Sequence, residues 1–386
     1  MDLKIFAKTI EPQAREQIDL LLAQEAFKDC KVRIMPDVHA GVGCVIGFTA
    51  NLGDKVIPNI VGVDIGCGML TVELGKIDVD FVKLDQVIRE RVPSGRAVHE
   101  VPGPAAALIR ELLCEDQLRN VEWLRASLGT LGGGNHFIEI DADEEENKYL
   151  IIHTGSRNLG KQVCEIYQDR AIKRIHSQAE ERKALIARLK AEGREQEISG
   201  ELKKIKKPRI PKELCYLEGD DRRDYLHDMR VCQRFAWLNR KIIARTILTG
   251  MGWHGIGQFQ TVHNYIDDHG IVRKGAISAE RGERVLIPIN MRDGCIIARG
   301  LGNPDWNESA PHGAGRIMSR AKAKEEIPIS EYQAAMDGIF TTSVSKDTLD
   351  EAPQAYKPME EILDCIADTV QVQRIIKPIY NFKAGE

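Results

Sequence analysis

The segment GVDIGCGM, residues 62–69, places the carboxylate of Asp64 and the thiol of Cys67 three residues apart among glycines. Because glycine has no side chain, this spacing leaves room for an ion to approach both groups. A thiolate is a soft ligand, carboxylate and imidazole ligands widen the choice of ion, and a sulfur flanked by glycines can bridge two metals. Taken alone, the segment predicts either a metal site or a tight turn with a buried cysteine.

Helix and strand patterns alternate on both sides of this segment. The spacing of apolar residues predicts helices over 11–28, 105–128 and 225–247. Short apolar or β-branched runs predict strands at 32–35, 44–48, 61–63, 136–140 and 149–152. We find no internal repeat, low-complexity tract or convincing linker. The sequence therefore predicts that residues 1–386 form a single large domain.

The most charged stretch, at about 176–223, predicts a charged helical excursion from this domain, broken by Pro208 and Pro211. Residues 203–212 carry a basic run without an acidic residue. A solvated face and a surface that contacts nucleic-acid phosphates explain this run equally well.

Composition and charge exclude several classes of protein. The 386 residues carry 54 basic and 58 acidic side chains, a formal charge of -4, so no global positive field attracts nucleic acid or an anionic membrane. The first 20 residues lack the apolar core of a signal peptide, and no apolar run approaches the roughly 20 residues of a membrane span. Nine scattered cysteines without a CxxC pair argue against a disulfide framework. We expect a cytoplasmic protein.

Four of the ten histidines stand beside glycine, asparagine or threonine in loop-like sequence: His136, His153, His263 and His312. A core histidine usually has apolar neighbours, so these four are the better candidates for ligands or catalysts. For any one of them alone a structural role would be favoured. Together with Asp64 and Cys67 they indicate a polar centre.

The glycines at 132–134 form a loop whose backbone N–H groups are suited to a phosphate. In the strand that follows, period two puts His136 on one face and Asn135, Phe137 and Glu139 on the other. One face can thus offer a metal ligand and the other a set of nucleotide contacts. The alternative is a bulged strand in which the histidine is structural and makes its hydrogen bonds within the protein.

Two further loops pair a histidine with an arginine. In HTGSR, the guanidinium of Arg157 lies four residues after His153 and is suited to clamp a phosphate with two hydrogen bonds. In HGAGR, His312 lies among small residues and is suited to act as a nucleophile rather than a ligand. A metal together with arginine indicates phosphoryl chemistry.

These segments together resemble the RtcB family of RNA-splicing ligases over nearly the whole chain. The matching motifs are GVDIGCGM, GTLGGGNHFIEI, HTGSRNLG, HNY, RKGA, HGAGRIMSRAKAK and a lysine near the C-terminus. The resemblance implies the distinctive RtcB-type α+β fold, with central β-sheets flanked by helices. It also implies a GTP- and Mn(II)-dependent RNA ligase that joins 2′,3′-cyclic phosphate or 3′-phosphate ends to 5′-hydroxyl ends.

The resemblance assigns roles to the candidate residues. Cys67 would bridge two manganese ions, with Asp64 and His136 completing one site and His153 and His263 the other. The catalytic residue His312 would attack the α-phosphorus of GTP, release pyrophosphate and carry GMP as a phosphoramidate. The GMP would then pass to the RNA 3′-phosphate to give an RNA-(3′)pp(5′)G intermediate, which the 5′-hydroxyl attacks.

A guanylate-binding set and an RNA anchor also follow from the resemblance. Arg157 would hold RNA or the triphosphate. The nucleotide-binding residues would be Asn135, His136, Phe137, Glu139, His263, Asn264, Pro288, Met291, His312, Gly313, Ala314, Gly315, Tyr356 and Lys383. One loop departs from the family, because a PGSMG-like sequence is replaced by Pro288 to Gly294, PINMRDG. This change predicts a divergent bacterial branch with altered nucleotide contacts.

Two other functions compete with RNA ligation. The same ligands suit a binuclear-metal cyclic phosphodiesterase that opens the cyclic phosphate and stops. The basic run at 203–212 suits a non-catalytic RNA-binding factor. The expected partner is RNA with broken ends, such as tRNA, another structured RNA or rRNA, with no DNA and no membrane, and the resemblance names no accessory activator.

Overall fold

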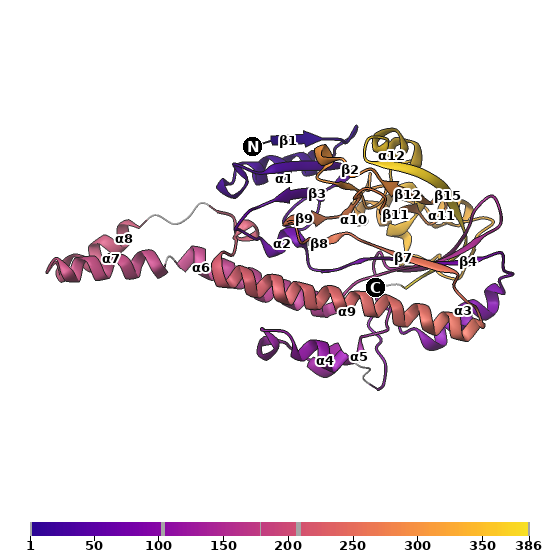
Figure 1. Cartoon of the computed structure of the whole chain (residues 1–386), viewed down its shortest axis with the longest axis horizontal. Helices are drawn as coiled ribbons and strands as arrows, with labels where there is room; N and C mark the ends of the chain where they lie inside the picture. Colours follow the sequence, from indigo (N-terminus) through magenta and orange to yellow (C-terminus); the bar gives the residue numbers. More distant parts are fainter. Residues whose placement is uncertain (1, 102–104, 178, 206–209, 385–386) are drawn as a thin grey trace.

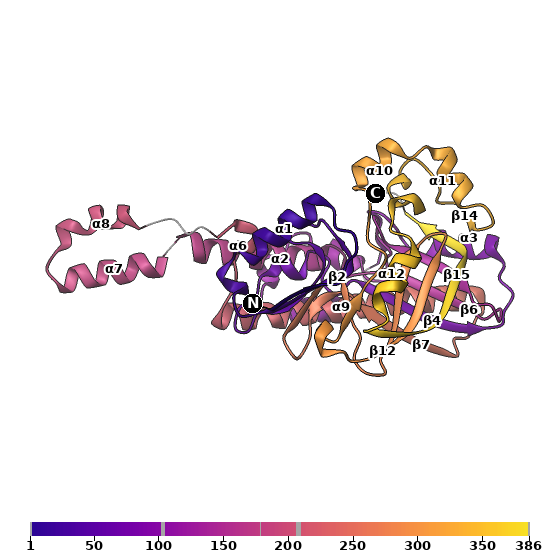
Figure 2. The same cartoon turned by 90° about the horizontal axis from the view of Figure 1, so that it is seen from above.

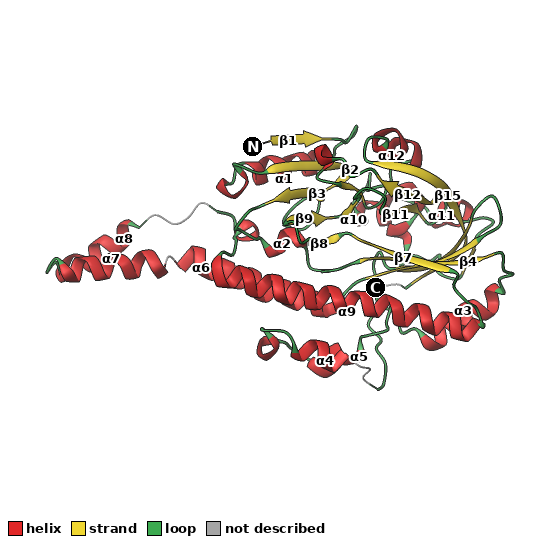
Figure 3. Cartoon of the chain, in the orientation of Figure 1, coloured by secondary structure: helices red, strands yellow, loops and turns green. Residues whose placement is uncertain are grey.

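Two β-sheets and a long helix organise the chain. The computed structural model describes residues 2–101, 105–177, 179–205 and 210–384. Figure 1 and Figure 3 show both sheets above α9 (Gly219–Met251) and α4 and α5 below it. At 33 residues α9 is about 50 Å long, enough to pass beneath both sheets. The predicted α+β class is confirmed.

The smaller sheet has five strands in the order β1-β2-β3-β9-β8, with β1 and β2 parallel and the other pairs antiparallel. Its strands are β1 (Asp2–Ile5), β2 (Lys31–His39), β3 (Ile46–Asn51), β9 (Ile271–Lys274) and β8 (Asn264–Ile266). A separate antiparallel pair is formed by β10 (Ala276–Ser278) and β13 (Ser309–Pro311).

The larger sheet follows the order β11-β12-β15-β5-β6-β4-β7, and β14 pairs with β15 beside this path. Its strands are β11 (Arg284–Asn290), β12 (Gly294–Gly300), β15 (Val370–Lys383), β5 (Phe137–Ala142), β6 (Lys148–Thr154), β4 (Gly68–Gly75), β7 (Gly257–Val262) and β14 (Phe340–Thr341). The backbone N–H of Leu286 on β11 donates to Oγ1 of Thr261 on β7 at 3.1 Å. Because these are the two end strands, the sheet curls into a nearly closed barrel.

Several helices pack against strands of the two sheets. The α-helices are α1 (Pro12–Leu22), α2 (Pro58–Val61), α3 (Phe81–Arg91), α4 (Ala105–Arg110), α5 (Val121–Ala126), α6 (Arg157–Ser177), α7 (Ala179–Ala191), α8 (Ile198–Lys204), α9, α10 (Arg320–Glu326), α11 (Ile329–Ala335) and α12 (Met359–Ile366). Short 3-10 helices are η1 (Glu25–Phe27), η2 (Glu115–Gln117), η3 (Glu195–Glu197), η4 (Lys212–Leu214), η5 (Pro304–Trp306), η6 (Leu349–Glu351) and η7 (Pro353–Ala355).

The strand β5 separates an apolar face from a site-bearing face. Its Ile138 and Ile140 pack with Ile243 and Ile247 of α9 in a buried core. Phe137, Glu139 and Asp141 alternate with these residues and point to the other side, as period two requires. The predicted strand at 136–140 and its alternation are confirmed, and the predicted strand at 149–152 lies within β6.

Two other expectations about local structure are wrong. The predicted helix over 105–128 is broken into α4, η2 and α5, because the Asp228 carboxylate of α9 accepts from the N–H groups of Leu113 and Cys114 at 2.8 and 3.1 Å. The predicted strand at 61–63 is instead the end of α2 and a turn. Pro58 begins that helix, and Gly62 ends it with a φ of 97°.

Figure 2 shows α7 and α8 side by side at one end of the molecule, beyond α6. They fall within the predicted excursion at 176–223, whose last residues already belong to α9. In the basic run, Lys203 and Lys204 end α8 and are exposed, whereas Lys206, Lys207 and Arg209 lie outside the described residues. None of the described helices combines the length and apolarity that crossing a membrane requires.

Candidate active site

Four neighbouring strands bring the predicted metal ligands to one edge of the larger sheet. Cys67 directly precedes β4, His136 directly precedes β5, His153 is the penultimate residue of β6, and His263 directly follows β7. Because these strands pair antiparallel, with Gly68 opposite Thr154 and Val262, and Phe137 opposite His153, the ligands share an edge.

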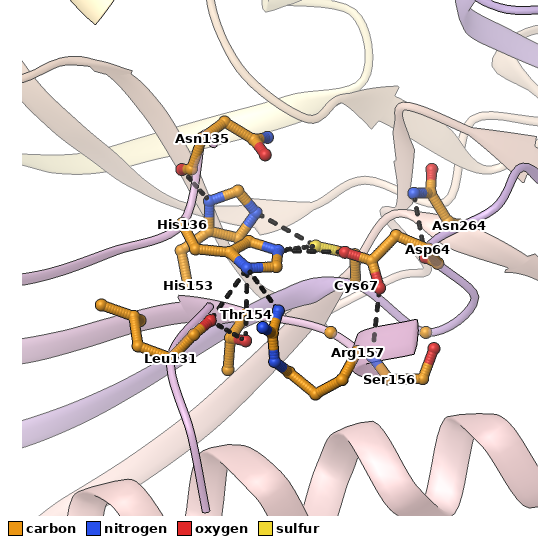
Figure 4. Close-up of polar contacts among 12 residues, drawn as sticks. Asp64, Cys67, Leu131, Asn135, His136, His153, Thr154, Ser156, Arg157 and Asn264 are labelled. Atoms are coloured by element: carbon orange, nitrogen blue, oxygen red, sulfur yellow. Dashed lines mark hydrogen bonds and ion pairs between the residues drawn. The ribbon is translucent and has the colours of Figure 1, made fainter. Parts of the chain in front are cut away.

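The donor atoms form two groups that share Cys67. Its Sγ lies 3.5 Å from Nε2 of His136 and 3.3 Å from Nε2 of His153. His136 Nε2 is 2.9 Å from Oδ2 of Asp64, and His153 Nε2 is 3.2 Å from Nε2 of His263. Figure 4 shows Asp64, Cys67, His136 and His153 pointing toward one another. The groups Asp64–Cys67–His136 and Cys67–His153–His263 are each compact enough for one ion.

The hydrogen bonds of two imidazoles leave their Nε2 atoms free to bind a metal. Nδ1 of His136 lies 2.9 Å from the carbonyl of Leu131, and Nδ1 of His153 lies 3.0 Å from that of Asn135. Each Nδ1–H therefore donates to a backbone oxygen, and the lone pair stays on Nε2. Burial lowers the pKa of His153 well below its usual value and keeps the ring neutral. Sulfur, carboxylate and imidazole donors in contact fit a pair of divalent cations.

A backbone N–H and the side chain of Asn264 hold Asp64 in place. Its Oδ1 accepts from the N–H of Ser156 at 3.1 Å, and Nδ2 of Asn264 donates to its carbonyl at 3.2 Å. A Cβ added at Gly155 would lie 2.1 Å from the same Oδ1, so glycine is required there. Burial opposes ionisation of Asp64, but its hydrogen bond with His136 lowers the pKa.

His312 lies beside the metal ligands and is held by a buried acid. Its ring centroid is 4.7 Å from that of His263. Oδ2 of Asp37, a fully buried residue of β2, lies 2.6 Å from Nδ1 of His312 and also accepts the N–H groups of His312 and Gly313 at 3.0 and 3.2 Å. The proton of the ring therefore sits on Nδ1, and Nε2 carries the lone pair. Asp37 was not predicted from the sequence.

A cavity of about 480 Å³ opens against His312 and His153. Its walls contain most of the predicted nucleotide-binding residues: Asn135, Phe137, Glu139, Pro288, Met291, Gly313, Ala314, Gly315, Tyr356 and Lys383. Three others, His136, His263 and Asn264, belong to the metal side of the centre and do not line the cavity. Because Asn264 also accepts from the N–H of Gly275 at 3.1 Å, its side chain braces the loop that carries Asp64.

A buried ion cluster forms one wall of the cavity around Glu351, another residue that was not predicted from the sequence. Glu351 pairs with Lys383 and Arg320 and accepts from the hydroxyl of Tyr356 at 2.8 Å. Burial opposes ionisation of Glu351, but Lys383 and Arg320, followed by Arg316, lower its pKa to about 2. The cluster fixes Lys383 and Tyr356 in the cavity wall.

Arg157 is placed differently from the other predicted residues. It does not line the cavity, and its guanidinium donates to Oγ1 of Thr130 at 3.2 Å and to the carbonyl of Gly95 at 3.3 Å. A Cβ on Gly132 would collide with it. In this arrangement Arg157 braces the glycine loop that precedes His136.

The divergent loop at Pro288 to Gly294 is the hairpin between β11 and β12. Oδ1 of Asn290 accepts from the N–H groups of Arg292 and Asp293 at 3.0 and 2.9 Å, so the side chain closes the turn. Ile289 is buried and lines the cavity, whereas Arg292 is exposed and pairs with Asp293. The larger residues of the loop are accommodated without blocking the cavity.

Comparisons with known proteins identify the family of the chain. The model of the family described as "tRNA-splicing ligase RtcB" matches residues 22–120 and 114–384. A relative named RNA-splicing ligase RtcB from Escherichia coli strain K12 is 31% identical, over 97% of this chain and 95% of its own length. A tRNA-splicing ligase RtcB from Archaeoglobus fulgidus is 28% identical over 86% of this chain and 83% of its own length. The chain belongs to the RtcB family of RNA-splicing ligases.

Proposed function

We propose that this protein is a GTP- and Mn(II)-dependent RNA ligase that joins a 2′,3′-cyclic phosphate or 3′-phosphate end to a 5′-hydroxyl end. One observation carries the proposal. The imidazole of His312 is oriented by Asp37. On one side it lies beside the two groups of metal donors, which share Cys67. On the other side it lines a cavity that is large enough for a nucleotide. Family membership supports RNA ligation as the activity.

His312 supplies the nucleophile. Because Nδ1–H donates to Asp37, the lone pair of Nε2 is free to attack the α-phosphorus of GTP. A P–N bond forms, the bond between the α-phosphorus and the bridging oxygen breaks, and pyrophosphate leaves. The Asp37 carboxylate stabilises the positive charge that develops on the ring, since it lies 2.6 Å from Nδ1.

The proposed metal ligands are the residues predicted from the sequence. Asp64, Cys67 and His136 would hold one ion, and Cys67, His153 and His263 the other. Bound manganese would offset the negative charge of the reacting phosphates. Burial and the neighbouring Asp64 raise the pKa of Cys67, so metal binding must displace its proton.

The cavity would hold the guanylate. The buried carboxylate of Glu139 is suited to accept from the N–H groups of a guanine edge, and Lys383 and Tyr356, fixed by Glu351, lie in the same wall. Asn135 lines the cavity one residue before the metal donor His136, so it would lie between the nucleotide and the metal ligands. The RNA 3′-phosphate takes GMP from His312, and the 5′-hydroxyl then attacks the activated phosphorus, with GMP as the leaving group. A cyclic phosphate is first hydrolysed to the 3′-phosphate.

Broken RNA is the proposed partner. The names of the relatives point to RNA and tRNA splicing. We propose tRNA, or another structured RNA with the same two kinds of end, as the substrate. Arg157 braces the catalytic centre and remains a candidate for contact with an RNA phosphate.

The test is a joining assay with two RNA strands bearing a 2′,3′-cyclic phosphate and a 5′-hydroxyl, in the presence of GTP and Mn(II). We expect joined product from the parent protein and none from His312→Ala, with His227→Ala, a half-buried histidine on α9, as the matched control. Joining by His312→Ala would refute the proposal. Opening of the cyclic phosphate without GTP and without joining would instead establish the cyclic phosphodiesterase.

A further inference from the structure

In the cavity wall and behind it, three strands of the larger sheet bring together four buried polar side chains. Glu139 and Asp141 lie two positions apart on one face of β5, Cys295 lies on β12, and Asn381 lies on β15 directly opposite Glu139. The carboxylates of Glu139 and Asp141 and the thiol of Cys295 are within 4.8 Å of one another. Asp141 and Asn381 have no exposed surface.

This cluster has more hydrogen-bond acceptors than donors. Among the described residues, both carboxylate oxygens of Asp141 and Oδ1 of Asn381 have no hydrogen-bond partner. Burying an ionised carboxylate without a hydrogen-bond partner costs far more free energy than burying the neutral acid. Burial, and then the neighbouring Glu139, raise the pKa of Asp141 well above its usual value. The surroundings of Asp141 therefore favour its protonated form.

Glu139 differs from Asp141 because it has a donor. Nδ2 of Asn381 donates to Oε1 of Glu139 at 3.1 Å. Burial raises the pKa of Glu139, and the hydrogen bond from Asn381, followed by the charge of Lys383, opposes this rise. The titratable groups that face Glu139 are Asp141 on the same strand, Cys295 on β12 and Lys383 on β15, whose ammonium group pairs with Glu351.

We propose that Asn381 is a positioning residue that sets the nucleobase specificity of the cavity, by holding Glu139 as an oriented carboxylate. The inference rests on the proposed function, since it requires a nucleotide in this cavity. Guanine presents N–H donors at N1 and at its 2-amino group, and an ionised Glu139 accepts from both. Adenine presents an acceptor at N1, which an ionised carboxylate repels and a protonated carboxyl group would bind.

The test is equilibrium binding of GDP and ADP to the metal-loaded, full-length protein at pH 7.5 and 8.5, because the pKa of Glu139 in the parent is about 7. Asn381→Leu is close to asparagine in shape and lacks the donor. Losing a hydrogen bond to a charged group is expected to lower the preference for GDP over ADP on the order of 10-fold at pH 7.5. Without the donor the pKa of Glu139 rises, so the preference should recover as pH rises and Glu139 ionises.

Two more variants isolate the cause. The amide of asparagine is uncharged, like a protonated aspartic acid. Asp141→Asn should therefore keep the parent's preference for GDP over ADP. Glu139→Gln cannot ionise and should show a low preference at both pH values, which also tests the proposal if Asn381→Leu fails to fold.

Three results would overturn the inference. One is a parent protein without preference for GDP, and another is an unchanged preference in folded Asn381→Leu. The third is loss of preference in Asp141→Asn together with loss of one metal ion per chain, which would make Glu139, Asp141 and Cys295 a cation site. GMP transfer to His312 is measured separately on the same samples. Selective GDP binding without that transfer would refute the proposed function and support this inference.

Discussion

The two ends of the active site, one with the metal donors and one with the nucleobase cavity, differ in the hydrogen-bond partners of their buried polar groups. At the metal end, His136 and His153 each have a backbone carbonyl partner, and their remaining nitrogen lone pairs meet a thiol and a carboxylate. At the nucleobase end, oxygens of Asp141 and Asn381 are buried without a partner among the described residues. We propose that cations complete the first end and that a ligand with N–H donors meets the acceptors of the second.

Removing Cys67 should have the largest effect, because both groups of metal donors depend on it. We expect Cys67→Ala to lose both bound manganese ions and to lower the rate of RNA joining at least about 10³-fold. Elemental analysis and the joining assay measure the two effects. Cys164→Ala, at another buried cysteine, is the matched control and should keep both ions. Full metal content in Cys67→Ala would contradict the assignment of the metal end.

Changing Asp37 separates the nucleophile from the metals. Asp37→Asn should lower the rate of GMP transfer to His312 on the order of 10³-fold, because an amide no longer stabilises the charge on the ring. Metal content should stay at the parent level, since Asp37 is outside both donor groups. The readouts are single-turnover transfer and elemental analysis. A rate within about threefold of the parent would show that Asp37 only packs against His312.

The ion cluster at the nucleobase end should leave a signature in acid stability. In the folded protein the pKa of Glu351 is lowered to about 2, so its contribution to stability is present above the unfolded pKa and lost as pH falls toward 2. Glu351→Gln should therefore lower the free energy of unfolding of the metal-free protein on the order of 3 kcal/mol at pH 7. The gap between parent and variant should shrink below about pH 4.5. A gap that is constant in denaturant titrations from pH 7 to 3 would contradict this.

The smallest effect is expected outside both ends, at the exposed Lys203 and Lys204 of α8. Lys203→Gln with Lys204→Gln should weaken RNA binding slightly and flatten its salt dependence by about one unit of slope for each RNA phosphate that a lysine no longer neutralises. Titrations at several salt concentrations measure this change. An unchanged slope would assign these lysines to solvent.

How much of the site could be predicted from the sequence depends on whether its residues lie in recognisable local segments or meet only in the tertiary fold. Asp64, Cys67, His136 and His153 stand in short glycine-containing segments, and the prediction that they gather in one centre agrees with the structure. Asp37 was missed because its partner His312 is 275 residues away in the chain and only the tertiary fold brings them together. Glu351 ends the short 3-10 helix η6, and nothing in the sequence pairs it with Lys383.

Asn381 and Asp141 escaped prediction for a related reason. Each resembles an ordinary residue of a strand, and only the pairing of β15 with β5 brings Asn381 opposite Glu139. The broken helix over 105–128 has the same origin, since it depends on a carboxylate from α9. Local pattern predicted most of the expected strands and the residues that gather in the centre, whereas contacts between distant segments decided the rest.

The proposed mechanism depends above all on His312 carrying GMP during catalysis. Intact-protein mass spectrometry after incubation with GTP and Mn(II), followed by peptide fragmentation, detects that adduct directly. We expect one GMP added to the parent protein, mapped to His312 and absent from His312→Ala. A folded, manganese-loaded parent without an adduct, or an adduct on another residue, would contradict the mechanism.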